Sequence, residues 1–125
     1  MIFSNSIIEC GDNSGGDKTK CINVNGNSKF GKIGSQLTVI LLRGNILKKL
    51  VKKKKYRGYI SCLKRNQRRL DGTYMLLDTN KIFLFERERH KFIGTRAFGC
   101  LSKELKDKKK DFQYKRIFST IDLVI

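Results

Sequence analysis

The chain has 125 residues, enough for one domain with a modest core, and its 28 Lys and Arg against 11 Asp and Glu give a net charge of +17. Residues 1–40 hold four lysines and three carboxylates, so nearly all of this excess lies in residues 41–125. A folded protein with such an excess repels itself unless a polyanion neutralises it, so RNA, DNA or an anionic membrane surface is the expected partner.

Short strands separated by Gly, Asn and Asp turns fill the first part of the chain. The pattern predicts strands over residues 2–10, 20–25 and 36–43, with a turn over 12–17 and a loop over 26–34. No Gly-Lys-Ser/Thr follows the glycines of the turn, which favours a hairpin turn over a phosphate-binding loop. The strand over 36–43 is the most apolar, so we expect it at the barrel centre.

Charge and turn residues divide the rest of the chain. The run Lys52–Lys55 predicts a projecting loop or ribbon over 44–55, because unbroken like charge does not pack. Strands are expected over 56–64, 73–77 and 81–85, the last two flanking a turn at 78–80, and the cationic segment 64–76 is expected to be a strand pair around Asp71-Gly72. One or two helical turns are expected over 103–110. The tail 112–125 is expected to dock through its apolar residues, which are Phe112, Ile117, Ile121, Leu123 and Ile125.

About six short strands with little helix predict a mainly β fold, a small closed barrel whose closure removes sheet edges. The most apolar run, Val39–Leu42, is too short to span a membrane, and no transit peptide is recognised. Proline is absent, alanine occurs once, and Lys, Ile, Asn and Phe are abundant, which indicates an A/T-rich gene such as an organelle's.

The four cysteines and one histidine argue against a metal centre, because no C-x-x-C pair is present. Without a secretory signal, reduced cysteines on apolar strand faces are expected rather than disulfides, as for Cys62. Glu86, Glu88 and His90 alternate with cations, which indicates an exposed charged segment rather than acid–base chemistry. We therefore predict no catalytic residue, no metal and no cofactor.

Cations gather at the predicted turns, where long side chains can reach phosphates while the strands form the core. Arginine adds a planar fork that binds phosphate bidentately and stacks on bases. No recognition helix for a DNA major groove is visible, so structured RNA is favoured. The tyrosines of Tyr56–Tyr59 fit base stacking or core packing equally well. The residues predicted to bind RNA are Lys48, Lys49, Lys52, Lys53, Lys54, Lys55, Arg57, Lys64, Arg65, Arg68, Arg69, Arg89 and Lys91.

Several motifs occur in a specific order along the chain. They are Asp12-Asn13-Ser14-Gly15, Cys21-Ile22-x-Val24-x-Gly26, Lys64–Leu76, and Ile93–Gly99 followed by Leu101–Leu105. In this order they resemble the universal family of large-subunit ribosomal proteins numbered fourteen, from Met1 to Ile125. The resemblance implies a five-stranded barrel with a projecting ribbon and short C-terminal helices, and no enzymatic activity. It also implies binding to large-subunit rRNA, contact with ribosomal proteins three and nineteen, and a place on the face that meets small-subunit rRNA. The ribosomal silencing factor is a possible further partner.

Gly94 and Gly99 bound a loop that we expect at a protein interface. The predicted interface residues are Thr95, Arg96, Phe98 and Lys103, with the Phe98 ring buried as an anchor and Arg96 pointing outward. An internal ion pair between Arg96 and Glu104 is the alternative.

The chain departs from the family where a proline is usual, at Leu70 and Cys100, and where a Gly-Asp turn is usual, near Lys54-Lys55. This drift and the A/T-rich composition favour a protein of a mitochondrial ribosome that is encoded in the organelle. A plastid or an A/T-rich bacterium is the alternative source. The alternative function is a free-standing basic barrel that binds single-stranded nucleic acid or acts as a translation factor.

Overall fold

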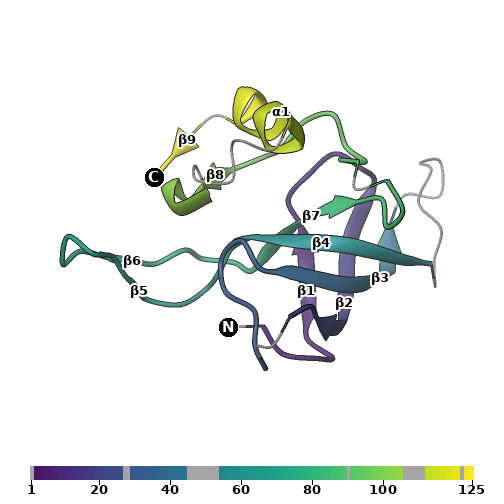
Figure 1. The fold of residues 1–125 in the computed structure, drawn as a ribbon, viewed down its shortest axis with the longest axis horizontal. Coiled ribbons are helices and arrows are strands. Elements are labelled where there is room, and N and C mark those ends of the chain that lie inside the picture. Colours follow the sequence, from purple (N-terminus) through teal and green to yellow (C-terminus); the bar gives the residue numbers. More distant parts are fainter. Residues whose placement is uncertain (1, 27–28, 45–53, 90, 106–111, 122) are drawn as a thin grey trace.

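A five-stranded closed barrel forms the body of the molecule (Figure 1). The computed structural model describes residues 2–26, 29–44, 54–89, 91–105, 112–121 and 123–125. The barrel strands are β1 (Ile7–Cys10), β2 (Gly16–Val24), β3 (Gln36–Gly44), β4 (Lys55–Cys62) and β7 (Lys81–Phe85). The remaining elements are β5 (Gln67–Arg68), β6 (Tyr74–Met75), β8 (Cys100–Leu101), α1 (Phe112–Thr120) and β9 (Leu123–Val124).

Barrel closure comes from the one parallel strand pair in the order β1-β2-β3-β4-β7. β1 runs parallel to β7, with Glu9 opposite Lys81 and Cys10 opposite Ile82, whereas the other neighbours are antiparallel. Closure leaves the barrel without a free edge that could pair with another chain. The predicted mainly β fold and closed barrel are confirmed.

β7 is apolar on both faces because each face covers a different core. Ile82 and Leu84 point into the barrel, where they join Leu37, Val39 and other interior residues. Phe83 and Phe85 point outward into a second core that also contains Phe92. The strand predicted at the barrel centre, β3, lies between β2 and β4, with Leu37 and Val39 in the interior and Leu42 on the outer face, where it is 40% exposed.

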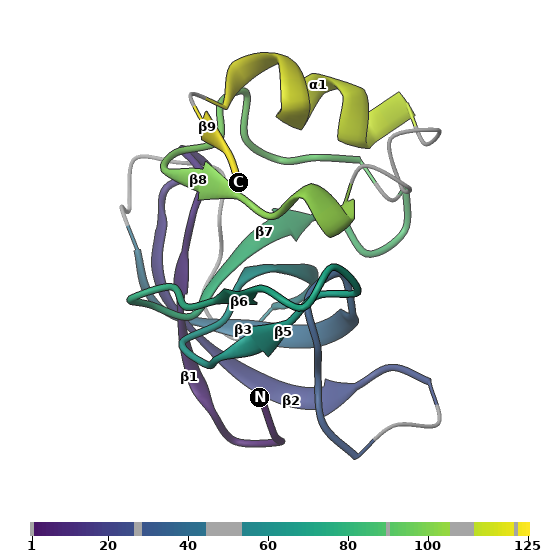
Figure 2. The same ribbon diagram turned by 90° about the vertical axis from the view of Figure 1, so that its left-hand side faces the viewer.

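The second core lies between the barrel and a C-terminal lobe. β8 and β9 form a short parallel pair, and α1 lies above them (Figure 2). Ile117 of α1 is fully buried and Ile121 packs nearby, so the tail docks as predicted, although Leu123 and Ile125 are 55% and 39% exposed. The Phe112 side chain lies outside the described part. Lys103–Leu105 form a 3₁₀ turn, and the rest of the helix expected over 103–110 also lies outside it.

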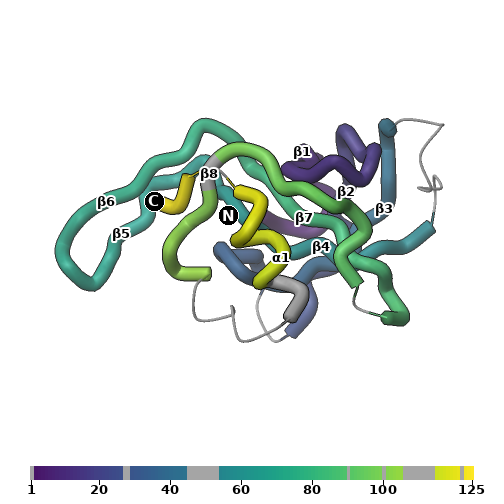
Figure 3. Tube along the Cα trace, turned by 90° about the horizontal axis from the view of Figure 1, so that it is seen from above, coloured from purple at the N-terminus to yellow at the C-terminus, as the bar shows by residue number. Residues whose placement is uncertain are grey.

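A β-ribbon projects from the body where β5 pairs with β6 (Figure 3). The strand pair predicted around Asp71-Gly72 is therefore confirmed. The two strands expected on either side of residues 78–80 do not pair with each other, because β6 pairs with β5 whereas β7 pairs with β4 and β1. Residues 45–53, most of the other predicted ribbon, lie outside the described residues.

Candidate nucleic-acid interface

One group of cations, which we call the barrel-end group, lies where β4 begins and β7 ends. Two adjoining clefts there, of about 230 and 320 Å³, are lined by charged side chains, with Tyr56 and Phe92 at the base of the larger cleft. The Lys54 ammonium lies 5.9 Å from the centroid of the Tyr56 ring. Glu86 and Glu88 are the carboxylates of these clefts, so the cations are in excess. The cations of the barrel-end group are Lys54, Lys55, Arg87, Arg89 and Lys91.

The predicted charged segment over residues 86–91 turns back on itself after β7. The Glu86 amide donates to the Lys91 carbonyl at 2.8 Å, and Phe85 and Phe92 form a bridge. Arg87 and Arg89 are exposed on this turn. The interpretation of the alternating charges as an exposed loop is therefore confirmed for the described residues, and His90 lies outside them.

A second group of exposed cations, the hairpin group, comprises Lys64, Arg65 and Arg68. The Lys64 amide donates to Asn80 Oδ1 at 2.8 Å, which fixes the base of the β5–β6 ribbon. Arg68 lies on β5 opposite Tyr74, near the tip of the ribbon. The ribbon therefore presents cations on a structured support.

A compact turn closes the ribbon tip. The Gly72 amide donates to the Arg69 carbonyl at 3.1 Å, and the Arg69 amide donates to the Thr73 carbonyl at 2.9 Å. The Asp71 carboxylate accepts from the Thr73 hydroxyl at 2.6 Å and from its amide at 3.1 Å. These hydrogen bonds hold the pKa of Asp71 below its usual value. Gly72 has a φ of 85°, which is why glycine follows Asp71.

The ribbon that carries the hairpin group projects at one end of the long axis, whereas the start of β4, where the barrel-end group begins, points toward the other end (Figure 1). Among the described residues, the two ion pairs are Arg43 with Asp17 and Arg69 with Glu104, so neither group is neutralised by an internal partner. Lys48, Lys49, Lys52 and Lys53 lie outside the described residues.

Two predicted RNA-binding arginines make contacts within the protein. Arg57 donates to the Gln36 side-chain oxygen, 2.9 Å from Nη1 and 3.3 Å from Nε, once the amide is oriented to satisfy both groups. Arg69 binds Glu104, and its side chain is only 13% exposed. The sequence pattern predicts that Arg69 binds RNA together with the neighbouring cations. In the structure its guanidinium instead contacts partners within the protein.

Asn13, which is 82 residues before Thr95 in the sequence, fixes the predicted interface loop. Its Oδ1 accepts from the amides of Thr95 and Arg96 at 2.8 and 3.0 Å, and its Nδ2 donates to Thr95 Oγ1 at 2.8 Å. A Cβ atom on Gly94 would lie 2.8 Å from Asn13 Oδ1, so glycine is needed for this close approach. The pattern of residues 12–17 predicts only a turn and gives no role to Asn13, although this residue belongs to one of the motifs that carry the family resemblance.

The buried residue Asp12 connects the same loop to the barrel. Its Oδ2 accepts from the Leu84 amide at 2.9 Å, and its Oδ1 accepts from the amide and hydroxyl of Ser14. Burial raises the pKa of Asp12, and these hydrogen bonds oppose the rise. Asp12 also forms a bridge with Ala97. The loop over 94–97 is thus tied to both the N-terminal turn and a barrel strand.

The loop has Arg96 on the outside, as predicted, but the predicted anchor is wrong. Phe98 is 45% exposed, whereas Ala97 is buried. The bridge to Asp12 turns Ala97 inward, and successive side chains of an extended segment point in opposite directions, so Phe98 faces out. The Arg96 guanidinium lies 5.8 Å from the Phe98 ring, and Glu104 pairs with Arg69 instead of Arg96. Thr95 and Lys103 are exposed.

Other kinds of site find no support in the described residues. No three His, Cys, Asp or Glu side chains there could hold a metal ion together. None of the helices described is both long and apolar enough to cross a membrane. Cys10 and Cys21 are free thiols, Cys62 is buried on β4, and the Cys100 side chain lies outside the described part.

Comparison with known proteins shows to which family the chain belongs. The family model described as ribosomal protein L14p/L23e matches residues 1–125. The chain belongs to this family. It is 35% identical over 111 residues to the large ribosomal subunit protein uL14 of Carsonella ruddii (strain PV), covering 87% of this chain and 90% of that protein. As a member of the L14p/L23e family it is a non-enzymatic component of the large ribosomal subunit, and rRNA and other ribosomal proteins are its partners.

Proposed function

We propose that the barrel-end group and the hairpin group are the surfaces through which this L14p/L23e protein binds large-subunit rRNA. The observation that supports this most directly is that both groups are exposed and structured, and that none of their cations forms an ion pair within the described residues. Phosphate contacts from two separated groups would fix the orientation of the protein on folded RNA. The lysines at 48, 49, 52 and 53, which precede Lys54 in the sequence, are proposed to bind rRNA as well.

The salt dependence of binding tests the proposed contact with phosphate. Each neutralised phosphate releases counterions, so about six or more contacts would lower the affinity roughly a thousandfold between about 50 and 200 mM salt. The measurement uses the full chain and transcribed large-subunit rRNA. A flat salt response would contradict the assignment of the cation groups to RNA.

We further propose that the loop with Thr95, Arg96 and Phe98 lies on the face that meets the small subunit. An exposed aromatic ring beside an exposed guanidinium, on a loop fixed by Asn13, is a rigid surface for a protein or RNA partner. Lys103 is exposed in the 3₁₀ turn, next to Glu104, which binds Arg69 of the ribbon, and is proposed as a separate interface residue. Ribosomal proteins three and nineteen, small-subunit rRNA and the ribosomal silencing factor are the proposed partners, and crosslinking on intact ribosomes would assign each.

Sedimentation separates the ribosomal function from its rival, a free-standing barrel that acts on single strands or as a translation factor. On a gradient in high salt, the protein should migrate with the large subunit. Migration as free protein would favour the rival function.

We propose that the ribosome is mitochondrial. A chain without proline, with one alanine and with abundant Lys, Ile, Asn and Phe fits an A/T-rich organelle gene, because these four amino acids have A/T-rich codons whereas Pro and Ala have G/C-rich ones. Fractionation of the source cells, with an antibody against this chain, should recover it in mitochondrial ribosomes. Recovery in plastids or in a bacterial lysate would overturn this compartment while leaving the rRNA-binding function untouched.

A further inference from the structure

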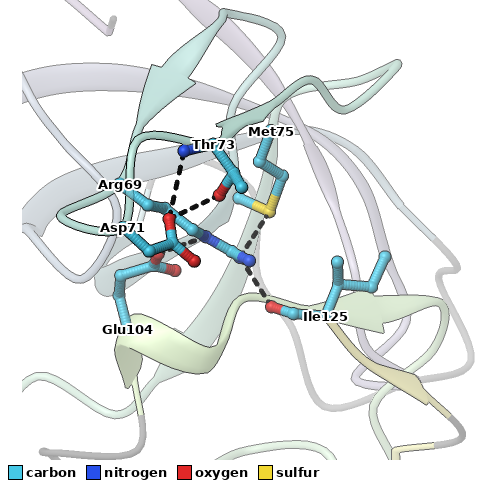
Figure 4. A network of polar contacts seen from close by, with 6 residues as sticks. All are labelled: Arg69, Asp71, Thr73, Met75, Glu104 and Ile125. Carbon is cyan, nitrogen blue, oxygen red and sulfur yellow. Dashed lines mark hydrogen bonds and ion pairs between the residues drawn. The ribbon is translucent and has the colours of Figure 1, made fainter.

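Arg69 joins three segments that are distant in sequence (Figure 4). Its Nε donates to Glu104 Oε1 at 2.7 Å, in the 3₁₀ turn. Its Nη2 lies 2.7 Å from the Ile125 carbonyl oxygen and 2.9 Å from Met75 Sδ on the ribbon. The guanidinium thus connects the tip of the ribbon to the C-terminal lobe.

The ribbon depends on such a connection because it is very short. β5 and β6 have two residues each and pair only through Gln67 with Met75 and Arg68 with Tyr74. An isolated two-stranded hairpin is marginal in water unless it packs against something else. Both the side view and the view from above place the ribbon beside the C-terminal end of the chain (Figures 2 and 3).

Arginine suits this place because its planar fork can donate in several directions at once, which the ammonium of lysine does less well. The Glu104 side chain is 41% exposed, so the ion pair with Arg69 contributes modestly to global stability. The main effect of these contacts is therefore on the position of the ribbon.

Neighbouring arginines have different surroundings. Arg68 is exposed, whereas the Arg69 side chain is 13% exposed and already bonded. We propose that Arg69 is a positioning residue for RNA binding: it orients the ribbon that presents the hairpin group, and it does not itself contact phosphate. This inference rests on the proposed binding of rRNA by that group.

Glu104 provides the sharpest test, because general electrostatics and positioning predict opposite results. Glu104→Gln removes a negative charge, which should tighten RNA binding if charge alone matters. If Glu104 acts by holding Arg69, the same change should weaken binding by roughly three- to tenfold, because the glutamine oxygen still accepts from Nε but without the charge that strengthens the bond. The side chain is partly exposed, so the variant should fold normally.

Salt slopes distinguish Arg69 from its neighbour. Arg68→Ala should reduce the slope of log affinity against log salt by about one phosphate contact. Arg69→Ala should weaken binding with the slope unchanged, and Arg69→Lys should weaken it nearly as much although the charge remains. In the Arg69→Ala background, Glu104→Gln should have little further effect.

The experiment uses the full chain and transcribed large-subunit rRNA, with amide exchange at Arg69 and Lys103 as a second measurement. Arg69 donates to Thr73 and Lys103 donates to Ile125, so both amides should exchange faster in Arg69→Ala and Glu104→Gln. A reduced salt slope for Arg69→Ala, full rescue by Arg69→Lys, or tighter binding by Glu104→Gln would overturn the positioning role. A flat salt response of the wild type, with no effect of Arg68→Ala, would instead mean that the proposed RNA-binding function fails.

Discussion

The side chain of Asn13 binds Thr95 in both directions: its Oδ1 accepts from the Thr95 amide at 2.8 Å, and its Nδ2 donates to the Thr95 hydroxyl at 2.8 Å. The two residues are 82 positions apart in the chain. The reciprocal pairing joins the turn over residues 12–17 and the loop over 94–97 into one structural unit. A residue of the N-terminal turn therefore fixes the loop that we propose as an interface.

Removal of this pairing should loosen the loop more than the barrel. Asn13→Ala deletes three hydrogen bonds, two of them from backbone amides, and we expect a loss of about 1–2 kcal/mol in the free energy of unfolding. Asn13→Asp is the matched control, since a carboxylate still accepts from both amides and the Thr95 hydroxyl can rotate to donate. Urea unfolding measures the stability, and amide exchange at Thr95 and Arg96 measures the loop. If both variants lost the same amount of stability, the hydrogen bonds that the Asn13 side chain accepts would not be what holds the loop.

Arg96→Ala should leave the fold almost unchanged while weakening assembly. Arg96 is exposed and has no ion pair among the described residues, so only its contact with the exposed Phe98 ring is lost. Such contacts contribute about 0.5–1 kcal/mol. Subunit joining or silencing-factor binding should fall, measured with reconstituted large subunits. Arg43→Ala, which removes an exposed cation paired with Asp17, is the control for charge. A large drop in melting temperature with normal assembly would rule out the interface role.

The pattern of apolar residues predicted the barrel because strand alternation and turn residues are local features. Leu37 and Val39 face inward, as alternation requires. The unbroken run Ile82–Phe85 indicated a strand but not the second core, since only the docked C-terminal lobe gives Phe83 and Phe85 something to cover.

The sequence could not assign the two adjacent arginines. Arg68 and Arg69 have equal charge and the same local motif, and which one turns inward depends on Glu104 and Ile125, whose positions follow from the fold. The prediction that Phe98 is buried was wrong for a similar reason. A large aromatic side chain is usually buried, but the bridge between Asp12 and Ala97 sets which neighbour faces the core.

The Cys10 thiol should be unreactive in the folded protein. Burial, with Asp12 and Asp17 nearby, raises the pKa of Cys10 from 9.0 to about 12. Only the thiolate is alkylated, so at pH 8 its reaction with iodoacetamide should be roughly a thousandfold slower than in the unfolded chain. Peptide mass spectrometry, with and without urea, compares the two rates at Cys10. Equal rates would contradict the raised pKa.

The same shift has a consequence for stability at high pH. A pKa that is raised on folding stabilises the folded protein below the pKa of the unfolded thiol, and this contribution is lost as pH rises toward the folded value. The stability of the wild type should therefore decline between about pH 9 and 12 more steeply than that of Cys10→Ala. Parallel pH profiles from urea unfolding would contradict the assignment of this decline to Cys10.

Leu70→Pro should stabilise the ribbon. Leu70 is fully exposed at the second position of the turn that the Gly72 amide closes on the Arg69 carbonyl, and proline is favoured at this position. Arg69 is extended, as the residue before proline should be, because its amide bonds across the ribbon to Thr73. No hydrogen bond from the Leu70 amide is found among the described residues, so its removal costs none.

The gain should come from the unfolded chain, whose entropy proline reduces, and amount to about 0.4–1 kcal/mol. Urea unfolding measures it, and slower amide exchange at Arg69 and Gly72 would place the gain in the ribbon. Leu70→Ala is the control, because it removes the same exposed side chain without restricting the backbone. If Leu70→Pro weakened the protein while Leu70→Ala did not, the turn would have a geometry that excludes proline.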